Sequence, residues 1–482
     1  MSLIPEPSGS EHDTGRPRGT ARRTVLSAAA LGLPLAATTL PAAAADKPES
    51  DGAPGTAQPP GRELRALLRE IDPRRIEATV RKLASFGTRH TLSVQDDPAR
   101  GIGAARDWIL AEMRRYAEAS GGRMTAELQS YVQEPASRIP VATRITNIVA
   151  TLRGSVAPER VYVVSGHYDS RVTDVMNATA DAPGADDDAS GVAVAMELAR
   201  VMATRRPAAT LVFAAVAGEE QGLYGSRHMA TQFKAAGADV QGMFTNDIVG
   251  SSTADDGTRD PYTVRLFAEG VPTAETPEQA SVRRSVGGEN DSPARQLARF
   301  VRDTSDNDAT GMRVRVIYRR DRYLRGGDHI PFLEQAYPAA RFTEPAEDFA
   351  HQHQDVRVVD GKQFGDLPEF CDFGYIARVA RVNGAALWTL AQAPGTPRNV
   401  RIRTSALTNS TQLEWDRGAE PDLAGYDVVW RETTAPEWEH VIDAGDVTAL
   451  EVDLSKDNVF FGVRARNHAG NCSPVAFPVP LA

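Results

Sequence analysis

Short apolar runs alternate with segments of helical periodicity in the middle of the chain, and this alternation constrains the fold more than any other feature. Residues 161–165 and 210–216 are apolar runs, and residues 191–204 between them have apolar side chains at helical spacing. Strands that are apolar along their whole length, with helices between them, are typical of parallel sheets buried on both faces. The chain therefore predicts an α/β domain with a mostly parallel mixed sheet flanked by helices.

The same patterns continue toward the C-terminus. We expect further strands at residues 240–248, 262–267, 314–318 and 340–343, and helices at residues 104–116, 293–302 and 373–391. These elements extend the α/β domain over residues 62–392.

Beyond a breaker-rich segment at residues 393–398, the apolar period changes to two. Alternating strands are expected at residues 400–403, 412–415, 426–430 and 460–465. Short alternating strands of this kind are typical of an antiparallel sandwich. The placing of Trp415 and Tyr426 resembles a fibronectin type III module, so residues 399–482 are expected to form a small all-β domain, with a flexible linker before it.

The N-terminus has the features of an export signal. Arg22 and Arg23 precede an apolar run and a string of alanines that suits signal peptidase. The apolar run is about 16 residues long, shorter than the ~20 that span a bilayer, and it is interrupted by Pro34. The pattern resembles a twin-arginine signal peptide at residues 1–45. We therefore expect a secreted protein with no membrane span in the mature chain and a flexible leader at residues 46–61.

Charge and cysteine content exclude several classes of function. A net charge of −10 argues against nucleic-acid or anionic-membrane partners, which require a clustered positive field. Cys371 and Cys472 fall in different predicted domains, so they either join the domains by a disulfide or remain two free thiols. With so few cysteines, any metal site in this chain must use histidine and carboxylate ligands.

Histidine and acidic motifs follow several of the predicted strands. His167 and Asp169 end the first of them, and Asp247 ends a third. Because the carboxyl ends of parallel strands meet at one edge of a sheet, these side chains are expected to converge. An imidazole bound to a metal needs its other ring nitrogen held, and Asp169 is placed to hold that of His167.

Two acidic runs are ambiguous when taken alone. The aspartates at residues 186–188 stand before a helix, where carboxylates usually cap the helix and interact with its dipole. Glu219 and Glu220 end the strongest predicted strand, and a solvated loop would also tolerate them. Together with the other motifs, one glutamate suits a metal ligand and its neighbour a general base on the attacking water.

A histidine pair occurs in a polar loop, where histidines are more often surface residues than ligands. A bimetallic site built on His167, Asp187, Glu220 and Asp247 still lacks one imidazole, and His351 is the expected supplier. His351 is expected to be a ligand only because the other motifs already supply the remaining ligands of such a site.

Over residues 75–390, the order of these motifs resembles that of the secreted two-zinc aminopeptidases of the bacterial leucyl type. The resemblance implies two zinc ions, with Asp187 bridging both of them. It further implies that His167 and Asp247 complete one site, that Glu220 and His351 complete the other, and that Glu219 is the general base and acid.

Substrate-side groups are harder to assign from the sequence. Tyr323 and Arg325 lie where such relatives place substrate contacts, and either could stabilise an oxyanion. Ala350 stands where relatives have a tyrosine before the last ligand histidine, which leaves the oxyanion donor unassigned.

The function expected from the sequence is that of an exported aminopeptidase acting on peptides or proteins. A carboxypeptidase or another amidohydrolase on the same two-zinc scaffold is the main alternative, because the metal ligands do not reveal which end of a substrate is held. Glutaminyl cyclases are usually one-zinc relatives, and the full ligand set disfavours them. A non-catalytic binding protein is disfavoured because no ligand or base is missing. The C-terminal domain would be a spacer or a contact to a polymer or surface.

Overall fold

The computed structural model describes residues 55–405 and 407–481. The expected signal peptide and the first part of the expected leader lie outside the described residues. All described residues belong to one compact unit. Among them, no helix combines the length and the apolar character that crossing a membrane would require.

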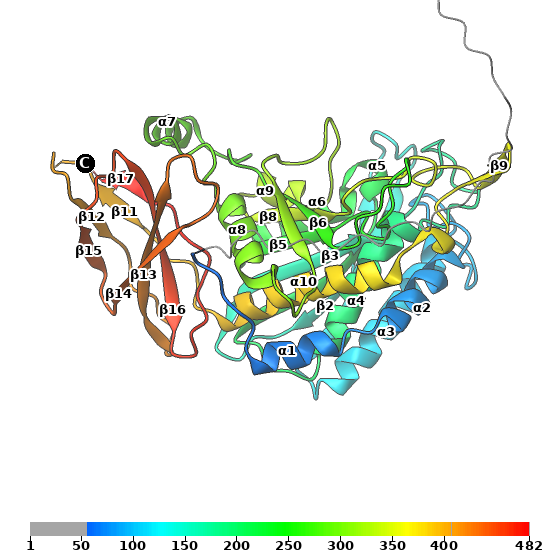
Figure 1. Cartoon of the computed structure of the whole chain (residues 1–482). Coiled ribbons are helices and arrows are strands. Elements are labelled where there is room, and N and C mark those ends of the chain that lie inside the picture. The colour runs from blue at the N-terminus through cyan, green and yellow to red at the C-terminus, as the bar shows by residue number, and fades with distance from the viewer. Residues whose placement is uncertain (1–54, 406, 482) are drawn as a thin grey trace, which may run out of the picture. The chain divides into compact units, whose positions relative to one another are not determined.

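An eight-stranded mixed sheet forms the centre of the larger domain, in the order β1-β2-β4-β3-β5-β8-β6-β7 (Figure 1). Its strands are β1 (Met124–Gln133), β2 (Thr143–Leu152), β3 (Ala157–His167), β4 (Ala209–Val216), β5 (Asp239–Asn246), β6 (Thr263–Phe267), β7 (Arg313–Ile317) and β8 (Ala339–Thr343). The four central strands β4, β3, β5 and β8 are parallel. The pairs β1/β2, β2/β4 and β6/β8 are antiparallel, which makes the sheet mixed, as expected.

Helices cover both faces of this sheet. They are α1 (Arg62–Arg69), α2 (Pro73–Ala84), α3 (Gly101–Ala119), α4 (Gly191–Met202), α5 (Glu219–Gly222), α6 (Tyr224–Ala235), α7 (Pro277–Val286), α8 (Pro293–Ser305), α9 (Ile330–Glu334) and α10 (Phe373–Gln392), with a π-helical turn η1 (Ala185–Ser190) and a 3-10 turn η2 (Pro368–Phe370). In the larger core, the helices α1, α2, α3, α4, α8 and α10 pack against the sheet. A smaller core on the other face contains residues of α6 and α9. Every residue of β4 is buried, as a strand covered on both faces requires.

A short two-stranded ribbon follows β8, and two further sheets form the C-terminal domain. The ribbon consists of β9 (Arg357–Val359) and β10 (Lys362–Phe364). The two sheets have the orders β15-β12-β11-β17 and β14-β13-β16. Their strands are β11 (Arg401–Arg403), β12 (Thr411–Glu414), β13 (Leu423–Glu432), β14 (His440–Gly445), β15 (Ala449–Val452), β16 (Val459–Asn467) and β17 (Val479–Leu481). Trp415 and Tyr426 pack in the core between the sheets, with ring centroids 5.4 Å apart.

The segment expected to be a flexible linker is held on both sides by hydrogen bonds. Arg160 donates to the Ala393 carbonyl at 2.6 Å, and Glu420 accepts from the backbone nitrogen of Gly395 at 2.7 Å. Thr396 donates its backbone N–H to Gln241 at 3.2 Å. The backbone groups of this segment are therefore hydrogen-bonded to the domains on either side of it.

The described end of the expected leader is also packed, which corrects the expectation of flexibility there. Thr56 is buried, and its hydroxyl donates to Asp303 of α8 at 2.6 Å. Arg464 of β16 donates to the Thr56 carbonyl at 3.1 Å, and the side chain of Gln58 accepts from the backbone N–H of Cys472. Residues 55–58 therefore connect α8 to the C-terminal sheets.

Polar and aromatic contacts join the C-terminal sheets directly to α8 and the loop before it. Asp291 accepts from Arg299 of α8 and from Arg431 of β13, both at 2.8 Å. Trp438 is buried and donates its indole N–H to Gln296 at 3.0 Å. Cys371 and Cys472 are both free thiols, so no disulfide contributes to this junction.

Candidate metal centre

The acidic and histidine motifs meet at the carboxyl ends of the central strands. His167 is the last residue of β3, Asp247 follows β5, and Glu220 belongs to the short helix α5 after β4. Asp187 lies in η1, the turn that leads into α4. The topology therefore brings these side chains to one edge of the sheet, as expected for parallel strands.

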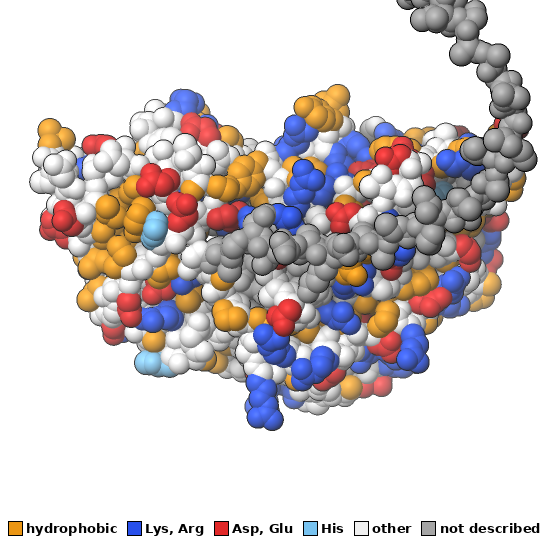
Figure 2. Space-filling view, in the orientation of Figure 1, with side chains coloured by type: hydrophobic (Ala, Val, Ile, Leu, Met, Phe, Trp, Pro, Cys, Tyr) orange, Lys and Arg blue, Asp and Glu red, His pale blue; other side chains and the backbone are white. Residues whose placement is uncertain are grey.

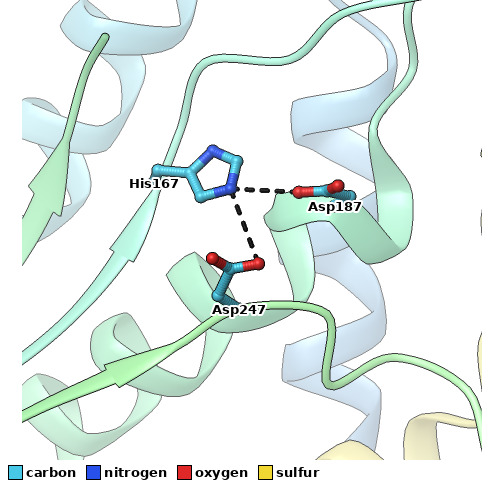
Figure 3. A group of neighbouring side chains, drawn as sticks. All are labelled: His167, Asp187 and Asp247. Atoms are coloured by element: carbon cyan, nitrogen blue, oxygen red, sulfur yellow. Dashed lines mark ion pairs between the residues drawn. The ribbon is translucent and has the colours of Figure 1, made fainter. Parts of the chain in front are cut away.

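The first group of potential ligands consists of His167, Asp187 and Asp247 (Figure 3). Nε2 of His167 lies 3.0 Å from Oδ1 of Asp187 and 3.9 Å from Oδ1 of Asp247. All three side chains are buried. One imidazole nitrogen and two carboxylate oxygens at this spacing suit zinc.

The second group shares Asp187 and adds Glu220 and His353. Nε2 of His353 lies 2.7 Å from Oδ2 of Asp187 and 3.0 Å from Oε1 of Glu220. Oε1 of Glu220 is buried and accepts no hydrogen bond within the described residues, so its lone pairs are available to a cation. The two oxygens of Asp187 thus face different groups, which is the arrangement of a bridging carboxylate.

His353, and not His351, supplies the second imidazole, which corrects the expectation from the sequence. The ring of His351 stacks on Phe370 with centroids 3.6 Å apart, and its Nδ1 lies 3.4 Å from Asp348. His353 adopts a left-handed backbone conformation with φ of 56°, which turns the loop so that its ring reaches Asp187.

The neighbouring charges alter the pKa values of the second group. Burial alone would lower the pKa of His353, but the carboxylates of Glu220 and Asp187 raise it to about 10. Burial would raise the pKa of Asp187, yet the two imidazoles hold it well below its usual value. Asp187 therefore remains ionised and able to bind a cation.

Backbone hydrogen bonds to buried carboxylates hold the ligand turn η1 in place. The two oxygens of Asp366 accept from the backbone N–H groups of Asp186 and Asp187, each at 2.8 Å. Asp188 accepts from the backbone nitrogens of His167 and Gly191, both at 2.9 Å. The neighbours of Asp187 thus position the turn rather than contribute to either ligand group.

Asp247 is positioned by Arg341, and the residue before it is held by a pair of amides. Arg341 of β8 is fully buried, and its guanidinium lies 2.7 Å from Oδ1 of Asp247. At the end of β5, the amides of Asn246 and Asn383 of α10 are paired. Charge-assisted hydrogen bonds of this kind orient a ligand and keep it ionised.

Asp169 acts on its surroundings in a different way from the one expected. The acceptor for Nδ1 of His167 is the Asp169 backbone carbonyl at 3.1 Å, whereas the nearest carboxylate oxygen lies 3.6 Å away. The Asp169 carboxylate instead accepts from the backbone nitrogens of Glu219 and Glu220, at 3.3 and 3.2 Å. It also accepts from the hydroxyl of Thr91 at 3.0 Å. Asp169 therefore fixes the start of α5, which carries the two glutamates.

Two buried or partly buried acids next to the ligands have raised pKa values. Removal of water from the Glu219 carboxyl raises its pKa well above the usual value, and the charge of His167 opposes this shift. Burial likewise raises the pKa of Asp328 to about 7. Asp328 is fully buried, and neither of its carboxylate oxygens has a hydrogen-bond partner within the described residues.

Tyr323 and Arg325 are not brought to the ligands. The ring of Tyr323 is 79 % exposed and packs under the guanidinium of Arg319. Arg325 pairs with Glu347 at 2.6 Å. The residue before the ligand histidine is Gln352, whose buried amide nitrogen lies 3.3 Å from Oδ2 of Asp187.

Sequence reasoning missed several residues that shape this centre, among them Asp328, Arg341, Gln352, Asp366 and Arg171, whose Nε lies 2.8 Å from Oε2 of Glu220. Gln352 and His353 belong to the histidine pair that the sequence singles out, so this motif could have indicated them. Asp366 lies in a loop without periodicity, and nothing local in the sequence marks it. Arg171 lies two residues after Asp169, but the sequence does not indicate its contact with Glu220.

Comparison with known proteins places this centre in context. The model of peptidase family M28 matches residues 147–358. A probable zinc metalloprotease of Leptosphaeria maculans is 58 % identical over 87 % of this chain and 98 % of its own length. A probable zinc metalloprotease of Pyricularia oryzae is 59 % identical over 88 % of this chain and 86 % of its own length.

Solved structures resemble this chain at lower sequence identity than these relatives do. The LapA aminopeptidase of Legionella pneumophila is 19 % identical, with a TM-score of 0.47, over 72 % of this chain and 78 % of the other. A glutaminyl cyclase of Porphyromonas gingivalis is 16 % identical, with a TM-score of 0.45, over 66 % of this chain and 97 % of the other.

Proposed function

The chain belongs to peptidase family M28, and from that premise we propose that it is an exported zinc aminopeptidase that uses two metal ions. The observation that carries the proposal is the carboxylate of Asp187, whose two oxygens face two separate groups of ligands. His167 and Asp247 complete one group, and Glu220 and His353 complete the other.

Zinc bound in these groups would polarise the scissile carbonyl and acidify the attacking water. Glu219 is the general base in this proposal, because it is adjacent to a ligand and its raised pKa makes its carboxylate a ready proton acceptor. The same carboxyl then returns the proton to the leaving amine. Asp169 keeps Glu219 in position through its backbone N–H.

The charges around the ligands favour a substrate held by its amino group. Asp328 offers a buried carboxylate without a hydrogen-bond partner in the described chain, and its charge acts on Glu219. The arginines next to the ligands are already engaged: Arg171 with Glu220, Arg341 with Asp247, and Arg138 with the Glu220 carbonyl at 2.9 Å. A carboxypeptidase needs a free cation for the substrate carboxylate, so the surplus of acid supports the aminopeptidase.

The oxyanion donor proposed here is Gln352, in place of Tyr323 and Arg325. Its amide lies beside the bridging carboxylate, and an amide N–H is a suitable donor to a developing oxyanion. The exposed position of Tyr323 and the ion pair of Arg325 do not favour those residues.

Export and the role of the C-terminal domain remain part of the proposal. The twin-arginine pattern at Arg22 and Arg23 supports secretion. Two packed sheets with Trp415 and Tyr426 between them support a fibronectin type III-like module. Figure 2 shows acidic and basic side chains interspersed over the face in view.

The variant Glu219→Gln tests the catalytic assignment. We expect turnover of an aminoacyl substrate to fall by about 10²- to 10⁴-fold, with zinc content unchanged at two per chain. Glu289→Gln, the same chemical change at an exposed ion pair, should leave both unchanged. Loss of zinc together with activity would show that Glu219 is a ligand, and full activity would place the base elsewhere.

A substrate panel tests the choice of terminus. Free aminoacyl amides should be cleaved, whereas N-blocked peptides with a free carboxylate should not. The opposite pattern would favour the carboxypeptidase.

A further inference from the structure

A basic loop with an apolar tip lies between β7 and α9. Residues 319–325 comprise four arginines and one aspartate, together with Tyr323 and Leu324, in a chain whose net charge is −10. In Figure 1 this loop rises above the sheet, and at the same place in Figure 2 apolar side chains form a tip with basic side chains beside it. The side chains of both Tyr323 and Leu324 are exposed.

The C-terminal end of this loop borders the metal centre. A Cβ added to Gly327 would lie 3.3 Å from Oδ2 of Asp247, and one added to Gly326 would lie 3.9 Å from Leu223, the residue that ends α5. Leu324 precedes Gly327 by three residues, and an extended chain spans at most about 3.6 Å per residue. The tip of the loop therefore stands within about 11 Å of the border of the metal centre.

Arginines outnumber acids in and around the loop. Glu347 accepts from Arg325 at 2.6 Å, and from Arg322 and Arg265 at 3.3 Å each. Arg322 also donates to Asp321 at 3.2 Å. Both acids are buried, so their pairing with several guanidinium groups leaves positive charge in excess at the loop.

The side chains of Arg319 and Arg320 are exposed, and neither forms an ion pair with another described residue. The guanidinium of Arg319 lies 3.9 Å from the centroid of the Tyr323 ring. The guanidinium of Arg320 lies 3.5 Å from the hydroxyl of Thr273. Two cations at the surface are thus open to a carboxylate that approaches from solvent.

The apolar tip is exposed in an unusual backbone conformation. Leu324 has a φ of 53°, in the left-handed region that residues other than glycine, asparagine and aspartate seldom adopt. Conformations of this kind cluster at sites that bind ligands or substrates. Aromatic residues and arginines are also enriched where proteins contact other polypeptides. The loop therefore has the composition of a contact surface for a polypeptide.

We propose that residues 319–325 dock polypeptide substrates and favour those with acidic side chains a few residues after the scissile bond. This inference rests on the proposed aminopeptidase function, because a substrate whose first residue lies at the metals must leave the centre past its borders. An extended substrate advances about 3.3 Å per residue, so the tip is within reach of about the third and fourth residues after the bond. A bilayer would meet a broad face of this acidic chain, whereas a peptide meets the basic loop alone.

The test compares hexapeptides that have a free amino terminus, share their first three residues and carry Glu, Gln or Lys at both residues four and five. Initial rates of release of the first residue are measured with the purified mature protein. We expect the KM of the Glu peptide to be about 3- to 10-fold lower than that of the Lys peptide, because each exposed ion pair contributes only a few-fold. The kcat values should agree, since the loop does not touch the reacting atoms. The preference should shrink at about 0.5 M salt.

Three variants separate the contact from the overall charge. Arg319→Gln combined with Arg320→Gln should remove most of the preference for the Glu peptide. Arg114→Gln combined with Arg115→Gln removes the same charge from two exposed positions of α3, and it should keep the preference. Leu324→Asn retains a residue that tolerates the left-handed conformation, and it should raise the KM of all three peptides by about two- to fivefold through the loss of apolar contact.

The outcomes separate failure of the inference from failure of the function. Equal KM values for the Glu and Lys peptides, or a preference that survives the change at Arg319 and Arg320, would overturn the inference and leave the aminopeptidase standing. An equal loss of preference in the Arg114 and Arg115 variant would also overturn it, because overall charge would then explain the effect. Sedimentation of the unaltered protein with phosphatidylglycerol vesicles, lost in the Arg319 and Arg320 variant, would overturn it in favour of a membrane contact. Failure to release the first residue from any of the peptides would overturn the proposed function.

Discussion

Replacing Asp303 by asparagine should remove a pH-dependent loss of stability. Asp303 lies in α8, where its Oδ2 accepts from Thr56 at 2.6 Å and its Oδ1 has no partner in the described chain. Burial raises its pKa from 3.8 to about 7, despite the bond from Thr56. An acid with a raised pKa in the folded state is a destabilising group at neutral pH, because folding then buries a charge.

The sign and size of the effect follow from proton linkage. Between about pH 4 and pH 7 the folded chain keeps a proton on Asp303 that the unfolded chain has released, so the free energy of unfolding falls as pH rises through this window. A shift of about three pKa units corresponds to ~4 kcal/mol once both states are ionised. Between pH 5 and pH 8 the expected loss is roughly 2.5 kcal/mol.

Urea unfolding of the mature protein and of Asp303→Asn at pH 5 and pH 8 measures this loss. Asparagine stays neutral and can still accept from Thr56, so the variant should not lose stability through this window. The free energy of unfolding of the variant, relative to that of the unaltered protein, should therefore rise by roughly 2.5 kcal/mol from pH 5 to pH 8. All other titrating groups are common to both proteins and cancel in this difference. If the two stability curves run parallel from pH 5 to pH 8, Asp303 is already ionised in the folded state and the reasoning is wrong.

Two further perturbations test the site and the domain junction. His353→Ala should remove about one zinc per chain and most activity, whereas His351→Ala should retain both zinc ions. Metal analysis and peptide hydrolysis measure the two effects. The reverse pattern would restore the assignment of His351 made from the sequence. Trp438→Ala should lower the free energy of unfolding by about 3–5 kcal/mol in urea titrations, because it empties a buried site and leaves Gln296 without its donor; a change below about 1 kcal/mol would mean that the junction repacks.

The predictable parts of the fold are those that a local pattern of apolar and polar residues indicates. Strand β4 is almost wholly apolar, β3 contains an apolar run, and most residues of β5 are buried. The histidine and acidic residues stand at or just after the strand ends, so the sequence alone indicates both the sheet and the edge that carries the site. The antiparallel pair β1 and β2 was not predicted. Most of β1 is exposed or half-buried, and its polar residues do not alternate clearly enough to indicate a strand.

The parts that were not predictable depend on loop geometry. His351 and His353 are chemically identical and two positions apart, and only the turn of the loop decides which ring faces Asp187. Asp366 lies almost 180 positions from the backbone groups that it binds. Packing of residues 55–58 and of the linker is likewise a tertiary effect, because their breaker-rich composition is typical of flexible segments.

The carboxylate of Asp187 couples the two halves of the centre mechanically. Its oxygens belong to one rigid plane, so a rotation that would suit a larger cation beside His353 would also tilt the oxygen that faces His167. Attempts to change the metal preference of one position must therefore redesign the opposite position as well.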